Sequence, residues 1–300
     1  MSVYHYARSV SLRATFVVSA SAMSIYCGSA YAVDAAPGAY LPMPVGSDLV
    51  MFFAGGGKAD EFQPVHGKAL KKGTELTTRT GLVRYFHMFE VAKHKVQLQF
   101  GLPFGRQDLK LNGKTIGHES GISDGFAAVN YWLIDDPALK RYLSVTGYIA
   151  IPTGSYKNNH SLNMGNNRYA NALVVAYAQS FGKWRVEFDQ DVTWYGDNDE
   201  YGPDKRKLKQ DPTYNFQHWL SYTFDNRVTT SLGVARTWGG ESSVEGVDTG
   251  RRTDYLRARA GVGYWMTKNV QLYTELNRDI EVRGGYKFDY TGFVRLAVLF

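Results

Sequence analysis

Apolar and polar residues alternate one by one along much of this 300-residue chain, and this period of two constrains its fold more than any other feature. Residues 287–300 are the clearest case. One set of alternate positions is apolar: Phe288, Tyr290, Val294, Leu296, Val298 and Phe300. The set between them is more polar: Asp289, Thr291, Phe293, Arg295 and Ala297. Because successive side chains point to opposite faces of a β-strand, the pattern predicts strands with one apolar and one more polar face.

Similar patterns recur along the chain and predict twelve strands. Their approximate bounds are 46–56, 78–91, 95–104, 122–133, 142–151, 168–180, 184–195, 213–224, 227–238, 253–266, 269–280 and 287–300. Short turns follow every second strand. Longer connections, rich in glycine and charge, follow most of the others: 57–77, 105–121, 152–167, 196–212 and 239–252. An even number of strands with short turns at one end and long loops at the other is typical of an outer-membrane β-barrel.

The physical chemistry of a membrane agrees with this interpretation. A sheet in lipid must close, because an open edge would leave backbone groups unpaired in hydrocarbon. Mean hydropathy is −0.31, and this excludes a bundle of membrane helices. We therefore expect an all-β fold, a closed antiparallel transmembrane β-barrel of about 12 strands over residues 46–300, with short periplasmic turns and long extracellular loops. A soluble β-sandwich with its charges in water is the alternative that alternation alone leaves open.

The N-terminus has the features of a secretory signal peptide over residues 1–32. Arg8 and Arg13 precede a short apolar stretch, and Ala30-Tyr-Ala32 matches a small-x-small cleavage site. Cleavage there removes two Arg and no acid, so the net charge falls from +6 to +4, too little to indicate a nucleic-acid partner. It also removes Cys27, the one cysteine of the sequence, which suits an oxidising compartment. The apolar, proline-containing residues 33–45 form either a periplasmic segment or a plug inside the barrel.

Aromatic residues near the strand ends suggest two membrane interfaces. We expect Trp132, Trp184, Trp265 and Phe300 at the short-turn end, and Trp194 and Trp238 at the long-loop end. A terminal Phe300 with apolar residues at alternate positions before it resembles the last strand of bacterial outer-membrane proteins. These features place the protein in the bacterial outer membrane.

Several short motifs resemble a known family. They are Tyr148-Ile-Ala-Ile-Pro-Thr-Gly-Ser-Tyr156, Asn166-Asn-Arg-Tyr169, Gly38-Ala-Tyr-Leu-Pro42, Tyr195-Gly-Asp-Asn-Asp199 and Leu208-Lys-Gln-Asp-Pro-Thr-Tyr214. In this order they resemble an outer-membrane transporter family labelled for the meta-cleavage pathway of phenol degradation, over most of the chain after residue 32. The resemblance implies a barrel and the passage of small, aromatic or apolar molecules. It implies no catalytic residue.

Charged residues at predicted inward positions are the candidate pore lining. They are Arg185, Glu187, Asp189, Asp191, Arg257, Arg259, Glu275 and Arg295. The short turn after the 168–180 strand should place Ala172, Val174, Ala176 and Ala178 beside the acids. A turn near Thr267 should place Arg259 opposite Glu275 and Arg257 opposite Asn277. Such charges either pair to fill the lumen or line an aqueous path that filters solutes by charge.

Catalytic and metal-binding motifs are weak. Gly121-Ile-Ser-Asp-Gly125 matches G-x-S-x-G, but a strand rather than a helix should follow Ser123. Gly113-Lys-Thr115 lacks the first glycine of a P-loop, so Asn112-Gly113 is better explained as a hairpin tip. The histidines form no H-E-x-x-H motif. We expect no bound cofactor and no metal site.

Two charged clusters fall in one predicted extracellular loop. Asp197, Asp199 and Glu200 could attract a cation, although they lack the ligand spacing of an EF-hand. Lys205-Arg-Lys207 and Lys209 form a basic run that either is solvated or contacts lipopolysaccharide at the outer leaflet.

Three functions are therefore compatible with the sequence. The favoured one is passive passage of small molecules through an outer-membrane channel, with membrane lipid, lipopolysaccharide and a small-molecule solute as partners. The second is a hydrolase built on a barrel, which would need a Ser–His or Asp–His pair on one rim. The third is a structural or adhesion barrel with a filled lumen.

Overall fold

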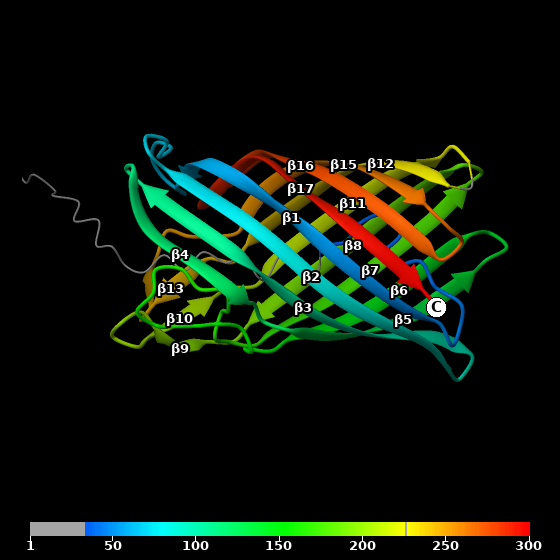
Figure 1. Cartoon of the computed structure of the whole chain (residues 1–300). Coiled ribbons are helices and arrows are strands. Elements are labelled where there is room, and N and C mark those ends of the chain that lie inside the picture. The colour runs from blue at the N-terminus through cyan, green and yellow to red at the C-terminus, as the bar shows by residue number, and fades with distance from the viewer. Residues whose placement is uncertain (1–33, 226) are drawn as a thin grey trace, which may run out of the picture.

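The fold is a barrel of long antiparallel strands (Figure 1). The computed structural model describes residues 34–225 and 227–300, so the predicted signal peptide at 1–32 lies outside the described residues. The wall strands are β1 (Asp48–Gln63), β2 (Glu75–Val91), β3 (His94–Leu111), β5 (Phe126–Asp136), β6 (Arg141–Ala150), β7 (Ala170–Phe181), β8 (Trp184–Tyr195), β11 (Thr213–Thr223), β12 (Val228–Gly239), β15 (Asp254–Trp265), β16 (Val270–Arg283) and β17 (Gly285–Leu299). Within the described ranges, no helix is long and apolar enough to cross a membrane.

The wall closes at its first and last strands. β1 pairs with β17, with Phe53 opposite Arg295, and also with β2, with Met51 opposite Arg84. β2 pairs in turn with β3, and the remaining strands follow in chain order around the wall. Closure pairs the backbone groups that an open sheet would leave exposed to lipid. The predicted closed barrel of twelve antiparallel strands is therefore confirmed.

The two faces of the wall differ as a membrane requires. On the outer face, Val262 is 44% exposed and Leu296 is 37% exposed. On the inner face, Glu187, Asp189 and Arg259 are all less than 5% exposed. Apolar groups point outward and charged groups inward, which is the reverse of a soluble barrel.

The strands extend further on the loop side than the sequence predicts. β1, β2 and β3 occupy much of the expected loops 57–77 and 105–121, and β4 (Lys114–Ile122) pairs with the far end of β3. These extensions lie beyond the apolar band, so no apolar face marks them in the sequence. The predicted hairpin tip is confirmed: Asn112 and Gly113 join β3 to β4 with φ of 49° and 76°.

A second, smaller sheet covers part of the loop end (Figure 1). It contains β9 (Asn198–Tyr201), β10 (Arg206–Gln210), β13 (Ser242–Val244) and β14 (Val247–Asp248). Tyr201, Leu208 and Val244 form its own small apolar core. The expected loops 196–212 and 239–252 are thus joined into one ordered structure.

The Pro-Thr-Gly-Ser motif follows β6 and begins a loop that folds back against the inner face of the wall. Leu162 of this loop packs in an apolar cluster with Leu76 and Leu109. At Gly154, a Cβ atom would lie 2.6 Å from the Cα atom of Gly165. The motif therefore needs glycine because two backbone segments cross in contact there.

Two predictions about side-chain direction are wrong. A register shift near Ala59 turns Phe288 inward, toward Leu76 and Leu109, whereas Tyr290 stays 63% exposed. Trp132 is not an interfacial residue, because it follows the inward positions of β5 and is only 1% exposed. By contrast, Trp184, Trp194 and Trp238 are at least 36% exposed.

Candidate transport lumen

Residues 34–42, here called the N-terminal segment, contact the inner wall of the barrel. The Asp34 carboxylate lies 2.7 Å from Nη1 of Arg259 on β15. The backbone N–H of Ala35 donates to Oε1 of Gln217 at 3.0 Å, and the indole N–H of Trp219 donates to the Ala35 carbonyl at 3.0 Å. Gln217 and Trp219 are inward residues of β11. β11 and β15 therefore hold the start of the segment.

Further contacts hold the middle of the segment to other strands. The N–H of Gly38 donates to Oε2 of Glu187 at 2.7 Å, and Arg185 donates from Nε to the other oxygen of Glu187 at 2.7 Å. Gly38 has φ of +80°, a conformation that favours glycine. The indole N–H of Trp132 donates to the Tyr40 carbonyl at 3.1 Å. The Tyr40 ring is buried in an apolar cluster that includes Ala128, Tyr148, Ala172, Val174 and Ala176.

The acidic side chains of β8 face small residues of β7. Glu187, Asp189 and Asp191 lie opposite Ala178, Ala176 and Val174, three of the four neighbours that the sequence predicts. Asp191 accepts a hydrogen bond from Nδ2 of Asn215 at 2.9 Å, and Asn215 accepts one from Thr237 at 2.9 Å. Small neighbours leave room beside these acids, and Tyr40 of the N-terminal segment packs against Val174 and Ala176.

Arg259 is the centre of a buried charge cluster. Its Nε and Nη2 atoms donate to Oε1 of Glu275 at 2.9 and 2.7 Å, and Nη1 donates to Gln217 at 2.7 Å. Tyr273 donates to the other oxygen of Glu275 at 2.8 Å. The guanidinium carbon lies 4.4 Å from the centre of the Trp219 ring. One cation is thus bound by two carboxylates, those of Asp34 and Glu275, and lies over an aromatic ring.

The predicted register of β15 and β16 is wrong by two residues. Arg259 lies opposite Asn277 and Arg257 opposite Asp279, whereas Glu275 is opposite Gly261. The turn is centred beyond Thr267, since the Thr267 hydroxyl accepts the backbone N–H groups of residues 269 and 270. Arg259 still reaches Glu275 diagonally. The shift creates a pair that the sequence does not predict, between Arg257 and Asp279 at 2.7 Å.

Arg295 is the remaining predicted lumen residue, and its surroundings differ from those of Arg257 and Arg259. Its Nη2 atom donates to Oε1 of Gln271 at 2.6 Å, and its guanidinium carbon lies 4.7 Å from the centre of the Tyr273 ring. All eight predicted residues therefore lie on the inner face, but Glu187 and Arg259 bind the N-terminal segment rather than line an open path.

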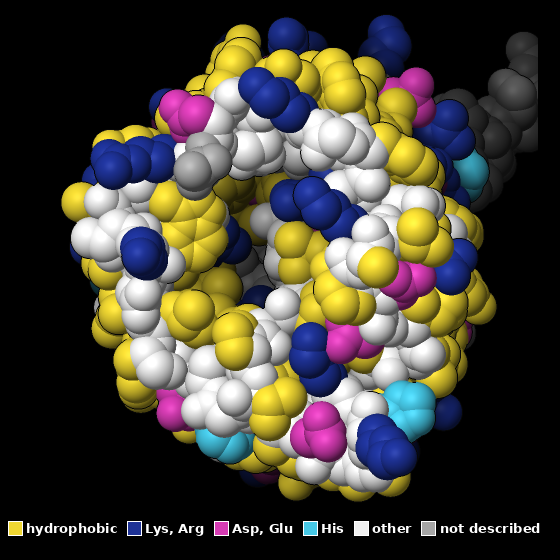
Figure 2. Space-filling view, turned by 90° about the vertical axis from the view of Figure 1, so that its right-hand side faces the viewer, with side chains coloured by type: hydrophobic (Ala, Val, Ile, Leu, Met, Phe, Trp, Pro, Cys, Tyr) yellow, Lys and Arg dark blue, Asp and Glu magenta, His cyan; other side chains and the backbone are white. Residues whose placement is uncertain are grey.

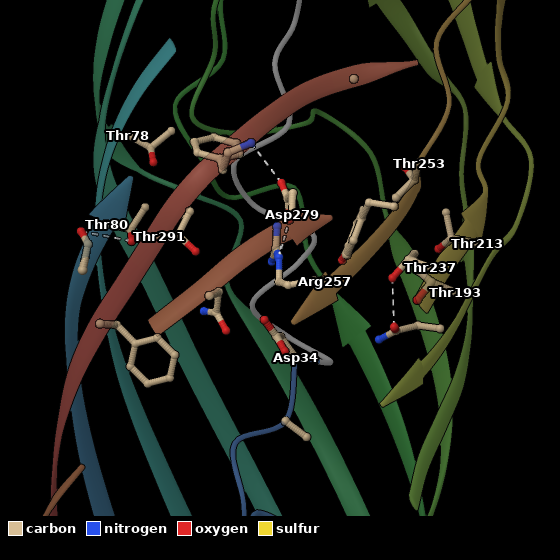
Figure 3. Close-up of a pocket in the computed structure, with 18 of the residues that line it drawn as sticks. Asp34, Thr78, Thr80, Thr193, Thr213, Thr237, Thr253, Arg257, Asp279 and Thr291 are labelled. Atoms are coloured by element: carbon tan, nitrogen blue, oxygen red, sulfur yellow. Dashed lines mark hydrogen bonds and ion pairs between the residues drawn. The ribbon is translucent and has the colours of Figure 1, made fainter. Parts of the chain in front are cut away.

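A cavity of about 360 Å³ lies inside the barrel beside the N-terminal segment. Figure 3 shows threonines around its walls, with Arg257 and Asp279 paired above Asp34. The aromatic residues of its lining are Tyr40, Phe53, Phe62, Phe86, Tyr148, Tyr195, Tyr255, Tyr286, Phe288 and Phe293. The threonines are Thr78, Thr80, Thr193, Thr213, Thr237, Thr253 and Thr291. The charged residues of the lining are Asp34, Arg84, Asp191, Arg251, Arg252, Asp254, Arg257, Asp279 and Arg295. Rings beside hydroxyl and charged groups suit a small molecule with an apolar body and a few polar atoms.

The short-turn end of the barrel is also hollowed. Figure 2 shows this end, with a central depression whose walls carry hydrophobic and basic side chains. The lumen thus has open space near the periplasm, a loop-side cavity, and the N-terminal segment bound to the wall beside that cavity.

Several lumen residues were not among the candidates. They are Asp34, Arg84, Gln217, Trp219 and Asp279. Four of them occupy inward positions, so the alternation of side chains along β2, β11 and β16 is the sequence signal that predicts them: Arg84, Gln217, Trp219 and Asp279. Nothing in the sequence indicates that Asp34 would reach Arg259.

The extracellular charges pair with one another. Lys207 lies 3.1 Å from Asp199 and 3.6 Å from Asp197, and Lys205 lies 3.0 Å from Glu200. The hydrogen bond to Asp199 raises the pKa of Lys207. Within the described ranges, no group of three or more histidine, cysteine or acidic residues could hold a metal ion.

The side chain of Ser123, in the G-x-S-x-G match, is buried and forms a structural hydrogen bond. It is only 2% exposed, and its hydroxyl donates to the Met164 carbonyl at 2.7 Å. The next residue, Asp124, accepts hydrogen bonds from the backbone of Gly154 and Asn166 at 3.0 and 2.7 Å. Together they fasten the loop after β6 to the barrel rim.

A closed barrel with apolar residues outside, a charged lumen and an internal cavity defines an integral protein of the bacterial outer membrane, of the channel class. The family model described as "Putative MetA-pathway of phenol degradation" matches residues 59–296. The chain belongs to this family.

Comparison with solved structures supports the assignment of the chain to outer-membrane β-barrels. The COG4313 outer membrane channel from Pseudomonas putida F1 is 29% identical, with a TM-score of 0.84 over 89% of this chain and 100% of that one. The β domain of the Bordetella autotransporter BrkA is 10% identical, with a TM-score of 0.54 over 86% of this chain and 100% of that one. The translocator domain of NalP from Neisseria meningitidis is 11% identical, with a TM-score of 0.50 over 90% and 93%. The last two share the fold alone. No curated protein gives a significant match.

Proposed function

We propose that this channel passes small aromatic or apolar molecules, and that residues 33–45 act as a plug that must shift before a solute can cross. In this proposal, residues 1–32 are a cleaved signal peptide and residues 46–300 form the conducting barrel. The observation that carries it is the cavity of about 360 Å³, which is lined by rings and hydroxyl groups and bounded by Asp34, Ala35, Ala36, Ala39 and Tyr40 of the N-terminal segment.

The contacts of the N-terminal segment support a movable plug. Its described polar contacts with the wall are four hydrogen bonds and one ion pair. These hydrogen bonds join the backbone of the segment to side chains of the wall and not to the backbone of any strand. Breaking them therefore leaves the closed wall intact. A solute that competes for these groups, or a rearrangement of the segment, would open the path.

A channel explains the described residues better than a hydrolase does. The Ser123 hydroxyl is bound to a backbone carbonyl in a buried position, and its described hydrogen-bond partner is Met164 rather than a histidine. His118, the nearest histidine in the sequence, pairs by register with Asp108 on β3. We therefore favour a protein without catalytic activity.

The basic run at residues 205–209 fits a weak contact with lipopolysaccharide. Lys205 and Lys207 each have an acidic neighbour, which reduces the positive charge offered to phosphate groups. Lys209 lies on β10 of the extracellular sheet. We propose that this contact is peripheral to transport.

The plug can be tested by single-channel recording of the purified protein in planar bilayers. Deletion of residues 34–42 should raise the conductance and lengthen the openings relative to the complete protein. Trp219→Phe, which removes one hydrogen bond to the segment and keeps a ring, should increase the frequency of openings. Tyr214→Phe is the matched control, because Tyr214 lies on the same strand as Trp219 but on the outer face, where it is 44% exposed. Absence of conductance in both the complete and the deleted protein, with the barrel folded, would contradict the proposal.

A further inference from the structure

Two buried arginines lie on either side of β1 inside the barrel. Arg84 on β2 is opposite Met51, and Arg295 on β17 is opposite Phe53. Met51 and Phe53 are two residues apart on the same face of β1. Both guanidinium groups line the cavity, and the residues are 8% and 5% exposed. We call β2, β1 and β17 the arginine wall.

These two arginines differ from the other arginines deep in the barrel. Arg185, Arg257 and Arg259 each form an ion pair with a carboxylate. Arg84 donates from Nη2 to Gln99 at 2.6 Å and to the Tyr148 hydroxyl at 3.2 Å, and Arg295 donates to Gln271 at 2.6 Å. Among the described residues, no carboxylate pairs with either, and Nε of each has no hydrogen-bond partner.

The acid that could neutralise this wall is already bound. Glu275 accepts hydrogen bonds from Arg259 and from Tyr273. The other acids of the cavity lining on this side also have partners: Asp279 pairs with Arg257, Asp254 with Arg252 and Arg236, and Asp34 with Arg259. The acids of β8 lie across the lumen, on the sixth strand from β1 in either direction around the wall. A buried cation without a counter-charge is costly, so an anion that enters the cavity gains strongly from binding here.

Aromatic rings frame the two guanidinium groups. Arg84 lies 4.9 Å from the centre of the Phe86 ring and 5.2 Å from that of Phe126. Phe53 and Phe293, whose ring centres are 5.7 Å apart, lie beside Arg295 in the lining. Amides and rings hold the cations in place, while the phenyl groups offer an apolar surface at the same site.

We propose that Arg84 and Arg295 bind the carboxylate of a small aromatic acid, and that the channel favours aromatic monocarboxylates over neutral aromatic molecules of the same size. This inference rests on the proposed channel function and names its solute class. The carboxylate faces the arginine wall and the ring packs against the phenyl groups. The acids of β8 repel a second carboxylate, so monoanions are preferred to dianions.

The test compares benzoate with benzamide, a neutral molecule of nearly the same shape, in proteoliposomes that contain the complete protein. Benzoate should pass faster than benzamide, and benzoate should slow benzamide uptake by competition. Arg84→Gln and Arg295→Gln should each reduce benzoate passage about tenfold, because each removes charge-assisted hydrogen bonds. Benzamide passage should stay unchanged. Arg79→Gln is the control, since Arg79 is exposed on the opposite face of β2.

The outcomes separate this inference from the function on which it rests. Equal passage of the two molecules through the unaltered protein, or equal losses for both in the variants, would overturn the carboxylate site and leave the channel in place. Passage of neither would overturn both. If the glutamine variants do not fold, as judged by the electrophoretic mobility of unheated samples, the comparison in the unaltered protein decides alone.

Discussion

The two sides of the lumen use buried charge differently. On the side of β8, β11 and β15, Glu187 binds Gly38 and Arg185, and Arg259 binds Asp34 and Glu275. On the arginine wall, Arg84 and Arg295 contact amides and rings and form no ion pair with a described carboxylate. The first set of charges is satisfied by the protein itself. The second is available to a solute, so equal burial of charge does not imply an equal role.

Loss of Arg259 should produce the largest change on the satisfied side. Arg259→Gln leaves the buried carboxylate of Glu275 and the partly exposed carboxylate of Asp34 without their cation. We expect a loss of about 3–5 kcal/mol of unfolding free energy. Urea titration of the protein in lipid vesicles measures it, with Arg79→Gln as a control that should change stability by less than about 0.5 kcal/mol. A loss as small as that of the control would show that the charge cluster around Arg259 does not stabilise the fold.

Loss of Glu187 should have a smaller effect on stability and a clear effect on the N-terminal segment. Glu187→Ala leaves the Gly38 N–H and the Arg185 guanidinium without their acceptor, which costs about 1–3 kcal/mol. Hydrogen exchange of residues 34–42 should accelerate while exchange in β15 and β16 stays slow. Equal acceleration throughout the barrel would indicate general destabilisation instead.

The stability of the protein should depend much less on the arginine wall than on the charge cluster around Arg259. Arg84→Gln removes a buried cation that has no carboxylate partner, so unfolding free energy should change by less than about 1 kcal/mol in either direction. The same urea titration, run beside Arg259→Gln, compares the two sides directly. A loss as large as that of Arg259→Gln would mean that Arg84 is a structural residue, and the distinction between the two sides would fail.

The smallest effect is expected at the barrel rim, on Asp124. Burial raises the pKa of this carboxyl above its usual value, against the opposing effect of its hydrogen bonds to Asn166 and Gly154. Because the folded pKa is raised, the loop after β6 should be most stable at low pH and lose a little stability as pH rises from about 4 through the raised pKa. Hydrogen exchange of residues 154–166 measured against pH tests the sign. Asp124→Asn should abolish the dependence.

Alternation and loop length predicted the barrel, its strand number and its faces, because a wall in lipid imposes one rule on every strand. The prediction from these patterns failed outside the lipid, where the wall no longer needs an apolar outer face. Strands beyond the apolar band, such as the far ends of β1 and β3, carry no lipid-facing pattern. The register shift that turns Phe288 inward and the turn after Thr267 each depend on local hydrogen bonds and packing.

The site was harder to predict than the wall. The eight charged candidates follow from parity, but their partners do not, because Asp34 and Gly38 reach Arg259 and Glu187 across a large sequence separation. Arg84 was overlooked because apolar residues occupy both faces of β2: Leu82 and Phe86 point inward and Val83 points outward. Contacts between a segment and a wall far away in sequence leave no periodic signal.

The most direct test of the contrast between the two sides is a crystal structure of the protein with 4-bromobenzoate, whose bromine can be located by anomalous scattering. The account predicts bromine density in the cavity among Phe53, Phe86 and Phe293, with the carboxylate turned toward Arg84 and Arg295. A carboxylate bound at Arg257 or Arg259, or a cavity without bromine at saturating ligand, would contradict it.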